Sequence, residues 1–104
     1  MENLTALEIL KAGRELTYFK NIMECDFIIR DRKSYFPVQV SYSLQDSDTK
    51  EREIKGLLKA CEYLKVKKGT IVTFEEEDNF SVSNIEIDVL PAYKFFLETL
   101  RKDE

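Results

Sequence analysis

Polar side chains on two neighbouring predicted strands could form the floor of a catalytic or metal-binding site. Glu24 and Asp26 alternate with apolar residues on the first strand, and Gln39 and Ser41 alternate with apolar residues on the second. Because successive side chains of a strand point to opposite faces, these four can share one face of the sheet. The two interpretations are a site for a hard cation such as Mg²⁺, or a sheet face that is simply wet.

The residue types that are missing narrow the possible chemistry. The chain contains no histidine, which excludes Ser–His and Cys–His nucleophilic catalysis and removes the commonest zinc ligand. Its two cysteines, Cys25 and Cys61, do not make a disulfide framework or a metal site, and both occupy apolar-face positions typical of small core residues. Any reaction would have to use carboxylates, lysine, tyrosine or a hard metal.

Composition indicates one soluble domain. The chain has 104 residues, of which 43% are hydrophobic and 35% are charged. Its net charge of −4 does not favour nucleic-acid binding through bulk charge. No apolar run is long enough to cross a bilayer, and the opening residues lack the pattern of a signal peptide, so we expect a cytoplasmic protein without membrane contact.

Short charged runs are interpreted as solvated surface. The acidic run 75–78 could attract a cation, but a hairpin tip explains it more simply. The basic runs are interpreted in the same way, as turns and as a favourable helix C-terminus. They comprise Arg30, Arg32 and Lys33, and further along the chain Lys65, Lys67 and Lys68.

Periodicity predicts an α/β (α+β) sandwich of order αβββαββα, in which helices flank a mixed sheet. Three strands separated by short polar turns indicate an antiparallel meander, and a strand that follows a helix allows a parallel crossover. The aromatic residues fall mainly in strands, where we expect them to pack in the core. The predicted elements are a helix at 3–12, strands at 15–20, 24–31 and 34–43, a helix at 49–64, strands at 69–76 and 84–91, and a last helix after Pro91.

Two of the helices carry clear sequence signals. Asp48 and Glu51 could form a capping box for the helix at 49–64, although Asp46 is also a good start residue. Pro91 is suited to opening the last helix. The expected buried face of that helix comprises Phe96, Leu97 and Leu100.

A carboxylate-bearing helix followed by this meander resembles the PD-(D/E)XK, or restriction-endonuclease-like, nuclease superfamily. The resemblance implies an αβββαβ core with a Glu on the first helix, an Asp on the second strand and a (D/E)-x-K on the third. Carboxylates so placed hold Mg²⁺ at the scissile phosphate, and the lysine helps to polarise the attacking water.

The chain resembles one branch of this superfamily more closely, namely the C-terminal domain that follows the AAA-like P-loop module of many bacterial and archaeal ATPases of unknown role. The resemblance runs in order through nearly the whole chain. The motifs that carry it are "MENLTALEIL" at the start, "ELTYFK" at 15–20, "ECDF" at 24–27, "PVQVS" at 37–41 and "VLPAYKFFL" at 89–97.

The resemblance places Glu8 at the helix acid, Asp26 at the strand acid, Gln39 where the third-strand carboxylate belongs and Ser41 where the lysine belongs. Gln39 is neutral and Ser41 carries no cation, so these four positions are expected to form a degenerate nuclease site without an intact catalytic residue, metal or cofactor. The alternative is a rearranged nuclease that binds Mg²⁺ through Glu8 and Asp26, with a lysine supplied by the helix at 49–64.

These expectations define a single nuclease-like domain over residues 1–104, a C-terminal fragment of a larger ATPase. It would be a non-catalytic accessory or binding domain. The expected partner is the ATPase module of the same parent chain, or else another protein or a nucleic acid. The absence of any P-loop motif agrees with a nucleotide-binding module that lies elsewhere.

Overall fold

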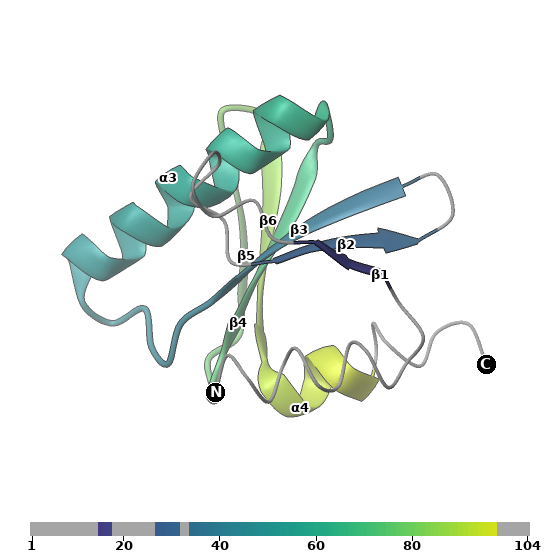
Figure 1. Ribbon diagram of the computed structural model, residues 1–104. Helices are drawn as coiled ribbons and strands as arrows, with labels where there is room; N and C mark the ends of the chain where they lie inside the picture. The colour runs from purple at the N-terminus through teal and green to yellow at the C-terminus, as the bar shows by residue number, and fades with distance from the viewer. Residues whose placement is uncertain (1–14, 18–26, 32–33, 98–104) are drawn as a thin grey trace.

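Six strands form one mixed sheet between two helices in the computed structural model, which describes residues 15–17, 27–31 and 34–97 (Figure 1). The sheet order is β1-β2-β3-β4-β6-β5. The elements are β1 (Glu15–Thr17), β2 (Phe27–Asp31), β3 (Ser34–Val40), α3 (Ser47–Leu64), β4 (Lys68–Thr73), β5 (Asp78–Val82), β6 (Ile85–Pro91) and α4 (Ala92–Phe95).

The topology confirms the predicted mixed sheet. Strands β1, β2 and β3 pair antiparallel as a meander. Helix α3 then crosses over, so that β4 pairs parallel with β3. Strand β6 pairs parallel with β4 on its other side, and β5 closes the far edge antiparallel to β6. The carboxyl ends of β3, β4 and β6 therefore meet at one end of the sheet.

Helix α3 begins two residues earlier than predicted, and its N-cap residue differs from the predicted one. The N-cap is Asp46, whose carboxylate accepts hydrogen bonds from the backbone N–H of Thr49 at 2.8 Å and from the hydroxyl of Thr49 at 2.9 Å. The predicted capping box of Asp48 and Glu51 is therefore wrong, because Asp48 already lies in the first turn. A carboxylate in the first turn still favours the helix through its dipole.

Each helix covers one face of the sheet. Leu57 and Cys61 of α3 pack with Ile71, Ile87 and other residues on one face. On the opposite face Phe95 of α4 packs in a second cluster, with Ile29, Val38 and Val72. Figure 1 shows α3 and α4 on opposite sides of the strands. The coarse prediction of a sheet flanked by helices is confirmed for the described residues.

A glycine sets how closely α3 approaches the sheet. Gly69 of β4 lies directly beneath Leu57, and a Cβ atom at this position would come within 2.7 Å of a Leu57 side-chain carbon. This separation is shorter than ordinary van der Waals contact. The short distance between α3 and β4 therefore requires glycine at position 69.

Strand β5 differs from the sequence prediction, which places an acidic turn at 75–79 and begins the last strand at 84. Asp78 and Asn79 are poor strand formers, so propensity hides this strand. The hairpin signal is the turn at Ser83 and Asn84, which adopt φ values of 53° and 66°. Positive φ at two consecutive turn residues matches the twist of a two-residue hairpin, which pairs β5 with β6.

The predicted buried face of the last helix is right only in part. Phe96 is partly buried and packs against the core cluster, but Leu97 is exposed and the fully buried residue is Phe95. Pro91 ends β6 facing inward, and the residue four positions later shares its side of the helix. The strand that leads into α4 therefore sets which face is buried. Leu100 lies outside the described residues.

Several strand aromatics expected in the core are exposed instead. Tyr35 and Phe36 of β3 are exposed, and so are Tyr42 and Phe74, which follow β3 and β4. Tyr35 and Phe36 precede the buried part of β3, whose burial begins at Pro37. Alternation identified the strands but not where their covered segments begin and end.

Some predicted features lie outside the described residues. These are the helix at 3–12, the ends of the first two strands at 18–20 and 24–26, and Cys25. Within the described residues, no helix combines the length and the apolar character that a membrane span requires.

Candidate functional site

Gln39 occupies the middle of the sheet and faces α3. It lies on β3 between Val38 and Val40, which pack on the opposite face with α4. Its side chain is only 3% exposed, and its amide Nε2 donates a hydrogen bond of 3.2 Å to the backbone carbonyl oxygen of Glu53. Gln39, the position at which the nuclease resemblance expects a metal-binding carboxylate, is thus a buried donor to a helix carbonyl.

This geometry suits an amide and disfavours a carboxylate. A glutamate at position 39 would present a negative oxygen to the carbonyl oxygen of Glu53 and would lose the donated hydrogen bond. Burial would add the cost of removing a charge from water. Position 39 therefore contributes a neutral structural contact between β3 and α3.

Ser41 is used in a local turn. Its hydroxyl donates to the backbone carbonyl oxygen of Ser43 at 3.0 Å, and its backbone N–H donates to Val72 at 2.9 Å. A serine bonded in this way extends the pairing of β3 with β4 by one residue. It supplies none of the positive charge that the nuclease lysine would provide.

Lys50 and Lys55 are the lysines of α3 considered as replacements for the missing cation, and both have other surroundings. The ammonium of Lys50 lies over the ring of Phe80 on β5, 5.1 Å from the ring centre. Lys55 is exposed and lies beside a shallow depression that Asp48, Glu51 and Arg52 also line. Lys50 therefore contacts the β5 edge, and Lys55 belongs to the solvent face of α3.

Glu53 is a residue at this face that the sequence analysis missed. Its side chain is only 15% exposed, and its Oε1 lies 3.8 Å from Nε of Arg52. The signal was available, because Glu53 is four residues before Leu57 and thus on the apolar stripe of α3. A carboxylate within such a stripe is uncommon enough to have been a candidate.

The two predicted carboxylates of the nuclease pattern, Glu8 and Asp26, lie outside the described residues, as does Glu24. Of the predicted set, the structure therefore places Gln39 and Ser41 only. Within the described part of the chain, no group of three or more potential ligands from His, Cys, Asp and Glu is arranged to hold a metal ion.

A family model decides where the chain belongs. It is described as "Domain of unknown function (DUF4143)" and matches residues 1–95. The chain belongs to this family. No curated protein and no solved structure matches the chain. The match covers Glu8, Asp26, Gln39, Ser41 and also Glu53, so the whole candidate site lies within the DUF4143 domain.

Cys61 of this DUF4143 domain is a core residue, as predicted. It is fully buried, and its Sγ donates a long hydrogen bond of 3.6 Å to the backbone carbonyl oxygen of Lys68. Burial raises the pKa of the Cys61 thiol to about 11. A thiol that stays protonated at neutral pH is a poor nucleophile and a poor metal ligand.

The basic clusters take part in ordinary surface contacts where the structure describes them. Lys68 forms an ion pair of 3.1 Å with Asp88. The guanidinium of Arg30 lies 5.9 Å from the ring centre of Tyr35. Both contacts involve exposed basic residues, so they agree with solvated surface and not with a built anion site.

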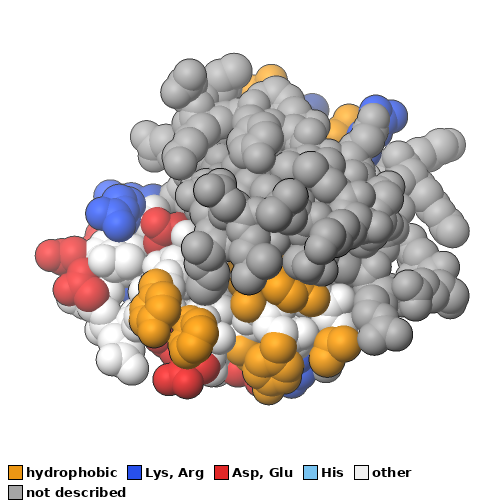
Figure 2. All heavy atoms as spheres, turned by 60° about the horizontal axis from the view of Figure 1, so that its bottom comes forward, with side chains coloured by type: hydrophobic (Ala, Val, Ile, Leu, Met, Phe, Trp, Pro, Cys, Tyr) orange, Lys and Arg blue, Asp and Glu red, His pale blue; other side chains and the backbone are white. Residues whose placement is uncertain are grey.

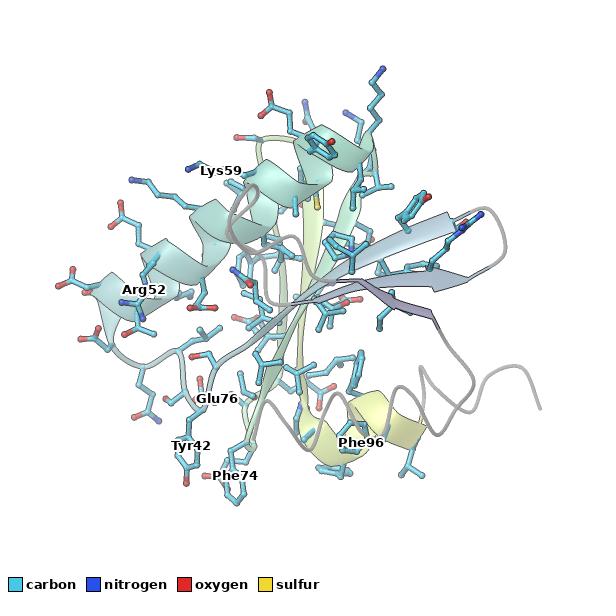
Figure 3. All side chains as sticks on the ribbon, in the orientation of Figure 1. Tyr42, Arg52, Lys59, Phe74, Glu76 and Phe96 are labelled. Carbon is cyan, nitrogen blue, oxygen red and sulfur yellow. The ribbon has the colours of Figure 1, made fainter. Side chains whose placement is uncertain are left out.

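At the carboxyl end of the DUF4143 sheet, an ordered acidic turn follows β4. Thr73 and Glu76 exchange two hydrogen bonds, of 2.8 and 2.9 Å, and Glu76 Oε1 accepts a bond of 2.9 Å from the backbone N–H of Leu44. Figure 3 shows Glu76 beside Tyr42, with Phe74 next to that ring at the end of the sheet. Glu76 thus links the loops that follow β3 and β4.

Proposed function

We propose that this DUF4143 chain is a non-catalytic accessory domain with a degenerate nuclease fold, which binds a partner on behalf of an ATPase module in the same parent protein. The hydrogen bond from Gln39 to the Glu53 carbonyl is the observation that carries this proposal. It supports a structural role for Gln39, at the position where the resemblance expects a metal ligand. A domain that has lost half of its catalytic pattern retains the fold for binding.

The arrangement of elements supports the nuclease-like ancestry. A three-stranded meander, a crossover helix and a parallel strand follow one another in the order that the restriction-endonuclease-like superfamily shares. The motifs quoted above for the ATPase-associated branch supply the link to a P-loop module. Fold resemblance alone does not assign activity, so the proposal rests on Gln39 and Ser41.

The charge of the chain favours a protein partner. With a net charge of −4, the domain gains little from contact with a nucleic-acid backbone. The ATPase module of the parent chain is the first partner to test, followed by another protein.

The second candidate function is a Mg²⁺-dependent nuclease with a rearranged site, and Glu53 is the observation that favours it. Its partly buried carboxylate on α3 could replace the one missing at Gln39. In that case Glu8, Asp26 and Glu53 would hold the metal.

A cleavage assay separates the two candidates. The chain is incubated with single- and double-stranded DNA and RNA in Mg²⁺ or Mn²⁺, alongside Asp26→Ala and Glu53→Gln, with the exposed Glu51→Gln as a matched control on the same helix. The accessory role predicts no cleavage above the level of Asp26→Ala. Cleavage by the unmutated chain would establish nuclease activity if both site variants abolish it and Glu51→Gln retains it.

A further inference from the structure

Two aromatic rings stack on each other in solvent at the carboxyl end of the parallel strands. Tyr42 follows β3 and Phe74 follows β4, and the backbone N–H of Phe74 donates to the carbonyl oxygen of Tyr42 at 3.1 Å. The ring centres are 5.1 Å apart and the planes differ by 9°. The two residues are 67% and 52% exposed.

The backbone on both sides of this aromatic pair is fixed. Glu76 bonds the loop after β3 through Leu44, and Thr73 closes the turn after β4. Figure 3 shows both rings projecting outward beyond the end of the sheet. The rings are therefore presented as a preformed surface, so little ordering cost remains to be met when a partner binds.

Acidic residues follow one member of the aromatic pair directly in the sequence. Phe74 is followed directly by Glu75, Glu76, Glu77 and Asp78. Glu77 forms an ion pair with Lys94, and Glu75 is exposed. In Figure 2 hydrophobic and acidic side chains lie next to one another on the face that it shows.

We propose that Tyr42, Phe74 and Glu75 form a docking surface for an arginine-bearing segment of a partner protein. A guanidinium group stacks on an aromatic face and is attracted by its quadrupole, while a neighbouring carboxylate accepts its N–H donors. Arginine satisfies both requirements better than lysine, because its planar group can stack and bond at once.

The charge of this surface decides against the other occupant that exposed aromatics can bind. Bases of single-stranded nucleic acid stack on such rings, but their phosphates need a basic groove. Here the residues after Phe74 are four consecutive acids. The inference names a partner chemistry for the binding role and rests on that proposed function.

The test titrates the isotopically labelled full chain with the peptide acetyl-Gly-Arg-Gly-Arg-Gly-amide and follows backbone amide signals. The amides of Tyr42, Phe74 and Glu75 should shift together, and the matching lysine peptide should bind more weakly. Phe74→Ser should weaken the arginine peptide by about threefold or more, and Glu75→Gln by about twofold. Tyr63→Ser is the matched control, because Tyr63 is 61% exposed on α3.

Several results would overturn the proposal. The first is equal affinity of the arginine peptide for Phe74→Ser and for the unmutated chain. The second is a set of amide shifts centred away from the aromatic pair. The third is preferential binding of an oligo(dT) strand at the pair. Circular dichroism of each variant confirms that the fold is retained. Metal-dependent cleavage would remove the accessory role without altering the peptide titration, so the two failures can be told apart.

Discussion

The side-chain amide of Gln39 donates a hydrogen bond of 3.2 Å to the backbone carbonyl oxygen of Glu53, joining β3 to α3. Gln39 occupies a position that the nuclease resemblance assigns to metal binding, and Glu53 lies on the helix that covers this residue. At this position the structure has an amide that donates to the helix backbone. The account of a degenerate site depends on this contact.

Replacing Gln39 by glutamate should destabilise the chain without creating an enzyme. The change removes the donated bond and places an acceptor against the Glu53 carbonyl, at an expected cost of about 1–3 kcal/mol in the free energy of unfolding. The cost should shrink at acid pH, where a protonated glutamate can donate. Urea denaturation of Gln39→Glu and of the unmutated chain at two pH values measures both effects.

Ser41→Ala is the control for that variant, because the Ser41 hydroxyl donates to a carbonyl oxygen just two residues away, in a local turn. Its effect should be smaller than that of Gln39→Glu. A stable Gln39→Glu variant that Mg²⁺ stabilises further would contradict the structural role of the amide.

Gly69→Ala should also destabilise the fold. The new methyl group would meet the side chain of Leu57 at 2.7–2.9 Å, so the Leu57 side chain or α3 itself must shift. Overpacking of this kind costs about 1–3 kcal/mol. Denaturant midpoints measure the loss.

A double-mutant cycle with Leu57→Ala tests the cause. Leu57→Ala should be destabilising alone. Adding Gly69→Ala to that variant should lower the free energy of unfolding much less than adding it to the unmutated chain. Additive effects would show that the two residues do not share the contact.

The Cys61 thiol should contribute a pH-dependent part of the stability. Its folded pKa of about 11 lies above the ordinary thiol value of 9.0 because the thiol is buried. The unfolded state therefore releases its proton first, so this contribution is complete below pH 9.0 and declines as the pH rises toward about 11.

The difference in unfolding free energy between the unmutated chain and Cys61→Ala separates the contribution of Cys61 from that of other titrating groups. That difference should be constant from pH 7 to 8 and should fall above pH 9.0. A difference that stays constant to about pH 11 would contradict burial of the thiol in the native state.

The Asp46 cap should weaken in acid. Two hydrogen bonds lower the pKa of Asp46 below 3.8. The backbone N–H of Thr49 has the larger effect, and the hydroxyl of Thr49 has the smaller one. Its stabilisation is therefore present above pH 3.8 and is lost as the pH falls through the lowered value. Asp46→Ala should lower the thermal midpoint at neutral pH, and Asp46→Asn should retain the cap while removing its acid sensitivity.

Hydrophobic patterning predicted most of the described fold because burial sets the periodicity. The stripe of Leu57 and Cys61 identified α3, and alternation at Ile85, Ile87 and Val89 identified β6. Strand β5 escaped because its Asp and Asn are poor strand formers, so its pairing depends on the turn at Ser83 and Asn84.

The candidate site was less predictable, because spacing does not show what a polar side chain contacts. Gln39 was located on the polar face, but the pattern could not reveal that its partner is the carbonyl of a residue 14 positions away. Glu53 was overlooked as a member of an otherwise apolar stripe. Tyr42 and Phe74 are exposed because they lie past the ends of β3 and β4, where the helices no longer cover the sheet. A local sequence pattern does not show where that cover ends.

The most direct test of the degenerate site is paramagnetic Mn²⁺ binding followed by amide relaxation. Mn²⁺ at a nuclease-type site would broaden the amide signals of Gln39, Val40 and Ser41, and Asp26→Ala would abolish that broadening. We predict no such broadening at these three residues, even if weak effects occur along the acidic turn after Phe74. Saturable, Asp26-dependent broadening centred on Gln39 would contradict the account and make this domain a metal-binding one.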